Sequence, residues 1–221
     1  MSIINIILDF IFPVDCISCG KRGEYLCIVC LAQIQEAQRE SLSWVFPLFD
    51  YRDPLIKKAL HLLKYKHKKP IANIFGSVLY NRIIEELSEL SLLENFTQPL
   101  LIPIPLAPKR KTERGFNQSL LICKYLMQID KTNRQNSFEL RYDILIKPKD
   151  TTHQAHIHNR TERLKNLLGS FNINIKNQTL VKNRNIILID DITTTGATLS
   201  EAKKTLKKYG AKKIIAFTIA H

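Results

Sequence analysis

Two adjacent carboxylates followed by a hydroxyl-rich loop are the first residues of this chain that could do chemistry. Asp190 and Asp191 come directly after four apolar residues at 186–189. The loop after them contains Thr193, Thr194, Thr195, Gly196, Ala197 and Thr198. N–H groups at a helix start and nearby hydroxyl groups can bind a phosphate, whereas carboxylates suit sugar hydroxyls or Mg²⁺. The pattern therefore predicts a site for a ribose 5-phosphate.

An acidic strand end followed by a capped helix is the simplest alternative explanation of this stretch. The complete order of apolar strand, two aspartates, hydroxyl residues, Gly196 and Thr198 resembles instead the phosphoribosyl-pyrophosphate (PRPP) signature of type I phosphoribosyltransferases. The resemblance implies that Asp190 and Asp191 hold the ribose hydroxyls and that the loop at 193–198 holds the 5-phosphate. It also implies that Mg²⁺ bridges the diphosphate and the ribose hydroxyls.

Arginines follow a second apolar stretch, at residues 100–106, which predicts a buried strand ended by prolines. Arg110 and Arg114 lie in the expected turn after this strand, just before a predicted helix. Open α/β sheets bind their ligands at the carboxyl ends of the strands, so this turn predicts a second anion-binding corner. We expect Arg110 and Arg114, together with the acidic pair, to act on the departing pyrophosphate.

Four cysteines form a separate candidate site near the start of the chain. Their spacing is Cys16-x2-Cys19, seven residues, and then Cys27-x2-Cys30. Two such knuckles offer four thiolates, enough to surround one tetrahedral Zn²⁺ and leave no open position for catalysis. The spacing favours a structural zinc finger over free or redox-active thiols. Cys123 lies among apolar residues and is expected to be a core residue.

A basic stretch with one tyrosine is the third candidate site. It contains Lys64, Tyr65, Lys66, Lys68 and Lys69. These cations can simply complement the dipole of a helix that ends there. They can also contact nucleic-acid phosphates while Tyr65 stacks on a base. Both explanations stay open from the sequence.

Taken in order, the motifs resemble the ComF (ComFC-type) proteins of bacterial competence. The four cysteines, "LKYK", "IPIPLAPKRKTERGFNQS", "TTHQAHIHNRTERLKNLLGSF" and "IILIDDITTTGAT" carry the resemblance, which covers nearly the whole chain. It implies a zinc finger joined to a type I phosphoribosyltransferase domain, with a role in single-stranded DNA uptake during natural transformation. It further implies a helicase-like ATPase as a partner, but it does not supply the acceptor of a transferase reaction.

In type I transferases the region corresponding to residues 147–166 is a hood that closes over the substrate. The resemblance implies pyrophosphate contacts from Lys149 and Gln154, with Lys147, Arg160 and Arg163 as further candidates. Two functions follow from these motifs. One is a PRPP- and Mg²⁺-dependent transferase, and the other is a non-catalytic single-stranded DNA-binding protein with PRPP as a regulator.

The composition agrees with either function. The 221-residue chain carries a net charge of +13, which favours phosphorylated partners, and its 45% hydrophobic content is typical of globular proteins. Residues 3–12 are apolar but too short to span a membrane, and they lack the basic leader of a signal peptide. We expect a short helix there that packs on the body, no membrane span, and a cytoplasmic protein.

Strands that alternate with helices predict an α/β fold with a mainly parallel twisted sheet of the type I phosphoribosyltransferase kind. Strands are expected at 44–51, 100–106, 141–146, 171–175, 186–189 and 213–219. One helix is expected to begin at residue 56. Further helices are expected over residues 71–90, through residues 120–126, and over residues 199–209. We divide the chain into a zinc finger (1–42), a linking strand with helices (43–98) and the transferase-like domain (99–221).

Overall fold

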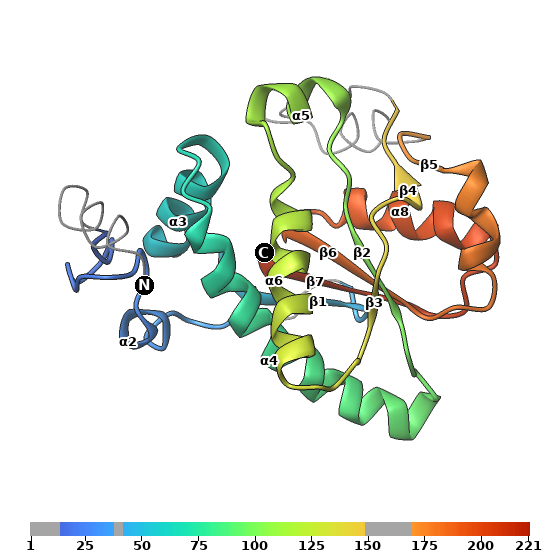
Figure 1. The fold of residues 1–221 in the computed structure, drawn as a ribbon, viewed down its shortest axis with the longest axis horizontal. Helices are drawn as coiled ribbons and strands as arrows, with labels where there is room; N and C mark the ends of the chain where they lie inside the picture. Colours follow the sequence, from blue (N-terminus) through green and yellow to red (C-terminus); the bar gives the residue numbers. More distant parts are fainter. Residues whose placement is uncertain (1–13, 38–41, 149–168) are drawn as a thin grey trace.

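A computed structural model describes residues 14–37, 42–148 and 169–221 (Figure 1). The expected N-terminal helix within residues 3–12 lies outside the described residues, as do Lys149, Gln154 and the rest of the expected hood after Pro148.

A five-stranded sheet forms the centre of the fold, and every pairing within it is parallel. The strand order is β1-β7-β6-β2-β3, so the strand that carries the acidic pair, β6, lies in the middle. The bounds are β1 Val45–Phe49, β2 Leu100–Pro103, β3 Glu139–Leu140, β6 Ile186–Ile192 and β7 Ile214–Ala220. The predicted parallel α/β fold is confirmed.

The helices cover both faces of this sheet, which is why β6 is apolar on both sides (Figure 1). Ile187 and Ile189 pack into a core with α3, α4 and α6, whereas Ile186 and Leu188 pack into another core with α8. Alternate residues of a strand point to opposite faces, so a strand covered on both faces needs a continuous apolar run. The bounds are α3 Pro54–Tyr65, α4 Pro70–Glu94, α6 Gln118–Thr132 and α8 Ala197–Lys208.

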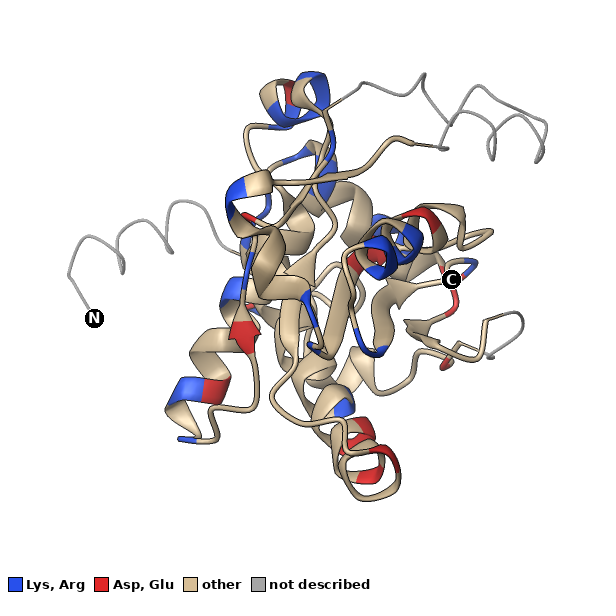
Figure 2. Cartoon of the chain, turned by 90° about the vertical axis from the view of Figure 1, so that its right-hand side faces the viewer, with Lys and Arg blue, Asp and Glu red and all other residues tan. Residues whose placement is uncertain are grey.

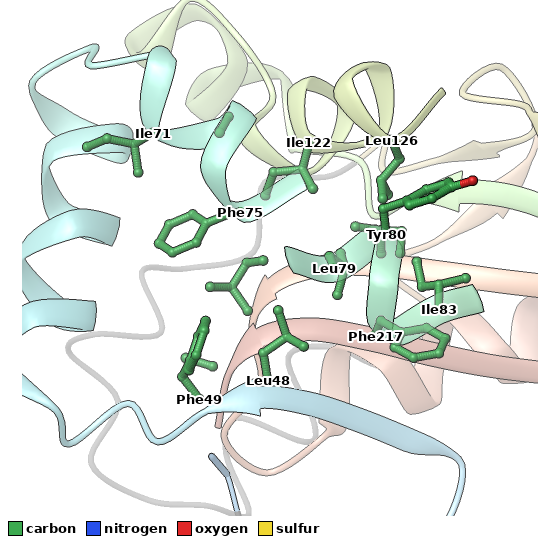
Figure 3. Packing of buried hydrophobic residues seen from close by; sticks show 14 of the residues in the cluster. Leu48, Phe49, Ile71, Phe75, Leu79, Tyr80, Ile83, Ile122, Leu126 and Phe217 are labelled. Carbon is green, nitrogen blue, oxygen red and sulfur yellow. The ribbon is translucent and has the colours of Figure 1, made fainter. Parts of the chain in front are cut away.

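The larger core lies where α4 and α6 pack against each other and against the same face of the sheet, α6 on β6 and β2 and α4 on β7. Phe75 and Leu79 of α4 lie close to Ile122 of α6 and, with Phe217 of β7, belong to one buried cluster (Figure 3). Gly76 permits this approach, because a Cβ atom at that position would lie 2.9 Å from Tyr125 Cβ. This packing sets the position of the first turn of α6, which borders the acidic pair.

Several boundaries differ from the sequence prediction. Of the strand expected over 141–146 only β4 (Leu145–Ile146) is present. β3 ends before it at Leu140, and between the two strands Arg141 forms a paired contact with Asp143, Nε–Oδ1 3.0 Å and Nη2–Oδ2 2.9 Å. The strand expected over 171–175 is reduced to β5 (Asn172–Ile173), which pairs antiparallel with β4, and a 3₁₀ helix follows at Ile175–Val181.

Two stretches expected to be irregular are helical. The turn that bears the arginines is a short helix, α5 (Pro108–Arg114), which begins with a proline and ends at Gly115 in the left-handed conformation. Helix α4 continues to Glu94, four residues beyond the end expected at 90. Strand β7 is not an edge strand of the sheet. Strand β1, from the expected linking segment, pairs with β7 on the side away from β6 and forms the edge.

The N-terminal part of the described chain contains a four-residue helix, α2 (Ile28–Leu31), beside the cysteines. An isolated bridge between Glu36 and Phe49 attaches this part to β1. Within the ranges that the structure describes, no helix combines the length and the apolar character needed to cross a membrane.

Candidate sugar-phosphate site and cysteine cluster

The acidic pair and the arginine-bearing corner meet because β6 and β2 are neighbours in the sheet. Ile189 pairs with Pro103, so the residues that follow each strand emerge at the same edge. A cavity of about 220 Å³ lies there. It is lined by Asp190 and Asp191, by the segments 104–107 and 192–199, and by Lys64, Arg110 and Lys147.

Asp190 is a buried carboxylate held by two hydrogen bonds to one oxygen. Its Oδ1 accepts the Ser119 hydroxyl at 3.1 Å and the Asp191 backbone N–H at 2.9 Å. Burial raises the pKa of the Asp190 carboxyl to about 6, against the lowering effects of Lys64 and the Ser119 hydrogen bond. The carboxyl can therefore change its charge close to neutral pH.

Asp191 is equally buried, but its partner is a lysine. Its Oδ2 forms an ion pair with Lys64 Nζ, and its Oδ1 accepts the Ile192 backbone N–H at 2.9 Å. Only 15% of the Lys64 side chain and 7% of the Asp191 side chain are exposed. Burial lowers the pKa of Lys64 to about 8, although the nearby Asp190 carboxylate opposes this shift.

The loop after β6 turns sharply at Gly196 and opens α8. Gly196 has a φ of +70°, which favours glycine, and a Cβ atom there would lie 2.2 Å from Leu42 Cδ1, so the Leu42 side chain would have to move. As the N-cap of α8, Gly196 has no side chain to satisfy the N–H groups of the first turn. These N–H groups and the hydroxyl groups of the loop, at the edge of the cavity, are suited to a phosphate.

The two predicted arginines take different positions. Arg110 lines the cavity, but Arg114 is not among the lining residues. Arg114 Nη1 donates to Gln118 Oε1 at 2.6 Å, and its guanidinium lies 5.5 Å from the centre of the Tyr65 ring. Arg110 thus lies at the wall of the cavity, whereas Arg114 lies between α6 and the end of α3, still within electrostatic range of Asp190, where its charge favours the ionised carboxylate.

The basic stretch at the end of α3 is also divided. Lys64 points into the cavity, whereas Tyr65, Lys66, Lys68 and Lys69 are exposed. Lys68 lies 5.5 Å from the ring of Tyr25, beside the cysteines, and Lys69 lies 5.4 Å from the ring of Phe116. We call these exposed residues, with Tyr25 and Phe116, the aromatic-basic surface. Figure 2 shows further Lys and Arg residues over α5.

Lys64 and Ser119 are neighbours of the acidic pair that the sequence does not predict. A signal for Lys64 was available, since it follows the buried Leu60 by four residues and so lies on the buried side of α3. No comparable signal existed for Ser119, which reaches Asp190 only because α6 packs beside β6.

The four cysteines of the N-terminal segment lie together. Their sulfur atoms are all within 4.8 Å of one another, and Cys19 Sγ and Cys27 Sγ are 3.6 Å apart. Zn–S bonds of about 2.3 Å in a tetrahedron place sulfur atoms about 3.8 Å apart, so the cluster can hold a metal such as zinc. Burial alone would raise the pKa of Cys16, but backbone N–H groups lower it to about 6. Cys123 is separate and buried, as expected, and burial raises its pKa.

Comparisons with known proteins agree with this geometry. Residues 136–221 match the family model of the phosphoribosyl transferase domain. The chain is 32% identical over 173 residues to the competence protein ComFC of Bacillus subtilis, covering 78% of this chain and 62% of that protein. It is 27% identical over 162 residues to the DNA utilization protein YhgH of Escherichia coli O157:H7, covering 73% and 65%. The chain thus spans less than two thirds of either relative.

Among solved structures, the chain shows similarity to a hypoxanthine phosphoribosyltransferase from Staphylococcus aureus. It shares 16% identity and a TM-score of 0.36 over 65% of this chain and 62% of that chain. No part of the site is inferred from that similarity.

Proposed function

The chain belongs to the ComFC-type family of phosphoribosyltransferase-like proteins, and from this premise we propose that it binds PRPP with Mg²⁺ in the cavity beside β6 and serves DNA uptake in the cytoplasm. The observation that supports this proposal is the shared cavity of the acidic pair and the loop at 193–198. A phosphate donor site next to two carboxylates fits a sugar that carries both a 5-phosphate and a free diol.

In this proposal each group has one task. The loop at 193–198 binds the 5-phosphate through N–H and hydroxyl donors, and Asp190 and Asp191 accept hydrogen bonds from the ribose hydroxyls. Arg110 faces the diphosphate. Mg²⁺, when bound with PRPP, neutralises part of the diphosphate charge. Lys149, Gln154 and Arg114, which lies outside the cavity lining, remain predicted contacts.

A transferase reaction would break the C1–O bond to pyrophosphate and form a bond from C1 to a nitrogen atom of an acceptor. Pyrophosphate leaves with the electron pair, so positive charge develops at C1 while negative charge develops on the leaving group. The aspartate carboxylates beside the ribose ring stabilise the positive charge at C1, and the guanidinium of Arg110 stabilises the negative charge on the pyrophosphate, both electrostatically. No covalent bond to the protein is needed.

Titration calorimetry with PRPP and MgCl₂ tests the proposal. The full chain should bind PRPP, and Asp190→Asn and Asp191→Asn should each weaken binding at least tenfold. Pyrophosphate release, measured with and without a single-stranded oligonucleotide, then decides between a transferase and a binding protein. Absence of PRPP binding by the unmodified chain would overturn the proposal.

The aromatic-basic surface favours a second candidate function, a non-catalytic single-stranded DNA-binding protein with PRPP as a regulator. The exposed Tyr65 ring, together with the half-buried Tyr25 and Phe116 rings among lysines, is suited to stacked bases and a phosphate backbone. A helicase-like ATPase, which the family association suggests, would then be a partner that delivers or receives the strand. DNA binding without pyrophosphate release would favour this candidate.

A further inference from the structure

The positively charged ammonium group of Lys64 lies beside the carboxylate of Asp191, which the proposed sugar diol needs as a hydrogen-bond acceptor. Its Nζ pairs with Asp191 Oδ2, while Asp191 Oδ1 accepts the Ile192 N–H. Oδ1 of Asp191 is thus hydrogen-bonded, whereas the buried Oδ2 accepts no hydrogen bond within the described residues and has only the ammonium group of Lys64 as its ion-pair partner. A ribose hydroxyl can take Oδ2 only if the ammonium group moves away.

The movement must be confined to the side chain. Leu60 and Leu63, which precede Lys64 on α3, are buried in the larger core and hold this end of the helix in place. The Lys64 side chain is largely buried, so its ammonium group has lost much of its hydration. If this group leaves Asp191 while it stays in the cavity, it needs another anion to offset the cost of that desolvation. In the cavity, PRPP would bring such an anion, because its diphosphate lies next to the ribose hydroxyls.

We propose that Lys64 is a diphosphate-binding residue, which neutralises Asp191 in the empty cavity and transfers to a diphosphate oxygen when the sugar diol takes its place. The inference rests on the proposed function, since it assigns a role within the same site. Lys64 precedes the region that matches the transferase family model, so the model match alone does not include it.

The alternative is a fixed ion pair that only stabilises the fold. The two roles differ in how they treat ligands with and without a diphosphate. A fixed pair makes Lys64 equally important for PRPP and for ribose 5-phosphate. A diphosphate-binding lysine matters for PRPP alone, and its loss leaves Asp191 free for the ribose hydroxyls.

The first experiment measures affinities by calorimetry for Lys64→Met, with Mg²⁺ present throughout. PRPP should bind about tenfold to hundredfold more weakly, which is the usual effect of losing a hydrogen bond to a charged group. Ribose 5-phosphate should bind as tightly as before or more tightly. Lys131→Met is the matched control, because Lys131 also lies in the last turn of a helix but is exposed. It should change neither affinity.

A second experiment uses the unmodified chain, so it does not depend on the folding of a variant. Acetic anhydride labels accessible amines, and mass spectrometry reports the labelled fraction of Lys64. Ribose 5-phosphate should raise this fraction above that of the unliganded chain, because the diol displaces the ammonium group. PRPP should lower it, because the diphosphate holds the ammonium group again.

Equal labelling of Lys64 in all three states, or equal weakening of both ligands by Lys64→Met, would overturn the inference while leaving the proposed function intact. Failure of the unmodified chain to bind either sugar phosphate would instead remove the proposed function itself.

Discussion

The Ser119 hydroxyl donates a hydrogen bond to the Asp190 carboxylate at 3.1 Å. This bond joins the first turn of α6 to the end of β6. The turn is itself held by Asn117, whose Oδ1 caps α6 and whose Nδ2 donates to the Ile104 carbonyl at 2.9 Å. The corner after β2 and the acidic pair are thereby held in one arrangement.

Loss of this hydrogen bond should change the pH dependence of PRPP binding. The Asp190 carboxylate must be charged to accept the ribose hydroxyls, so affinity should fall as the pH drops through about 6. Ser119→Ala removes a contact that lowers the pKa of Asp190, so the same fall should begin at a higher pH. Calorimetry between pH 5 and 8 measures both midpoints. The ligand phosphate titrates identically in the two series, and coinciding profiles would contradict the assignment.

Asp190 should also affect stability in the absence of ligand. Its pKa is raised in the folded chain, so its contribution to the free energy of unfolding is greatest below the ordinary pKa and is lost as the pH rises through about 6. Asp190→Asn removes this dependence. The difference in free energy of unfolding, variant minus wild type, should increase by about 2 kcal/mol between pH 4.5 and 7. Urea denaturation at each pH provides the measurement, and a constant difference would refute the pKa shift.

Removal of the metal should destabilise the N-terminal segment. We expect one zinc ion per chain by mass spectrometry, and a chelator should lower Tm by about 10 °C, because metal binding supplies folding energy. Cys30→Ser should reproduce the loss of metal. Cys123→Ala provides the control for metal content, since Cys123 lies outside the cluster and should leave the zinc content unchanged. Zinc retained by Cys30→Ser would exclude a four-cysteine site.

Gly196→Ala should damage the phosphate loop as well as the fold. The left-handed backbone costs alanine about 1 kcal/mol, and the added Cβ atom would also displace Leu42. Gly210→Ala is a matched comparison, because Gly210 has a φ of +83° but its Cβ atom would come no closer than 3.5 Å to a neighbour. Thermal melts should show the larger loss for Gly196→Ala. PRPP affinity should fall at least tenfold in that variant and stay unchanged in Gly210→Ala.

The aromatic-basic surface predicts the salt dependence of DNA binding. Replacing Lys66, Lys68 and Lys69 by glutamine should reduce the slope of log K against log salt concentration by about 2 for a single-stranded oligonucleotide. Replacing the exposed Lys131, Lys204 and Lys208 removes the same charge elsewhere and should leave the slope nearly unchanged. Fluorescence anisotropy at several salt concentrations measures both, and equal slopes would exclude this surface.

Features that depend on the order of neighbouring residues along the chain could be predicted from the sequence. The apolar run before Asp190 predicts a strand covered on both faces, and the two cores around β6 confirm it. The family and the parallel sheet are likewise confirmed. The domain limits at 42 and 98 and the roles of the site residues stay predictions.

Features that depend on distant contacts could not be predicted in this way. The ion pair of Lys64 with Asp191 joins residues that are far apart in the chain, and only the packing of α3 brings them together. The irregular segment between β3 and β4 contains the side-chain contact of Arg141 with Asp143, which a strand propensity does not include. The place of β1 beyond β7 follows from the order of strands in space rather than in sequence.

The outer side of β1 is covered by the segment that follows the cysteines. Ala37 N–H donates to the Leu48 carbonyl at 3.0 Å, and Asp50 N–H donates to the Gln35 carbonyl at 3.4 Å. Without the metal this segment would detach and expose an apolar strand edge, which can pair with the same edge of another molecule. We therefore expect the soluble amount of the protein to fall when zinc is withdrawn.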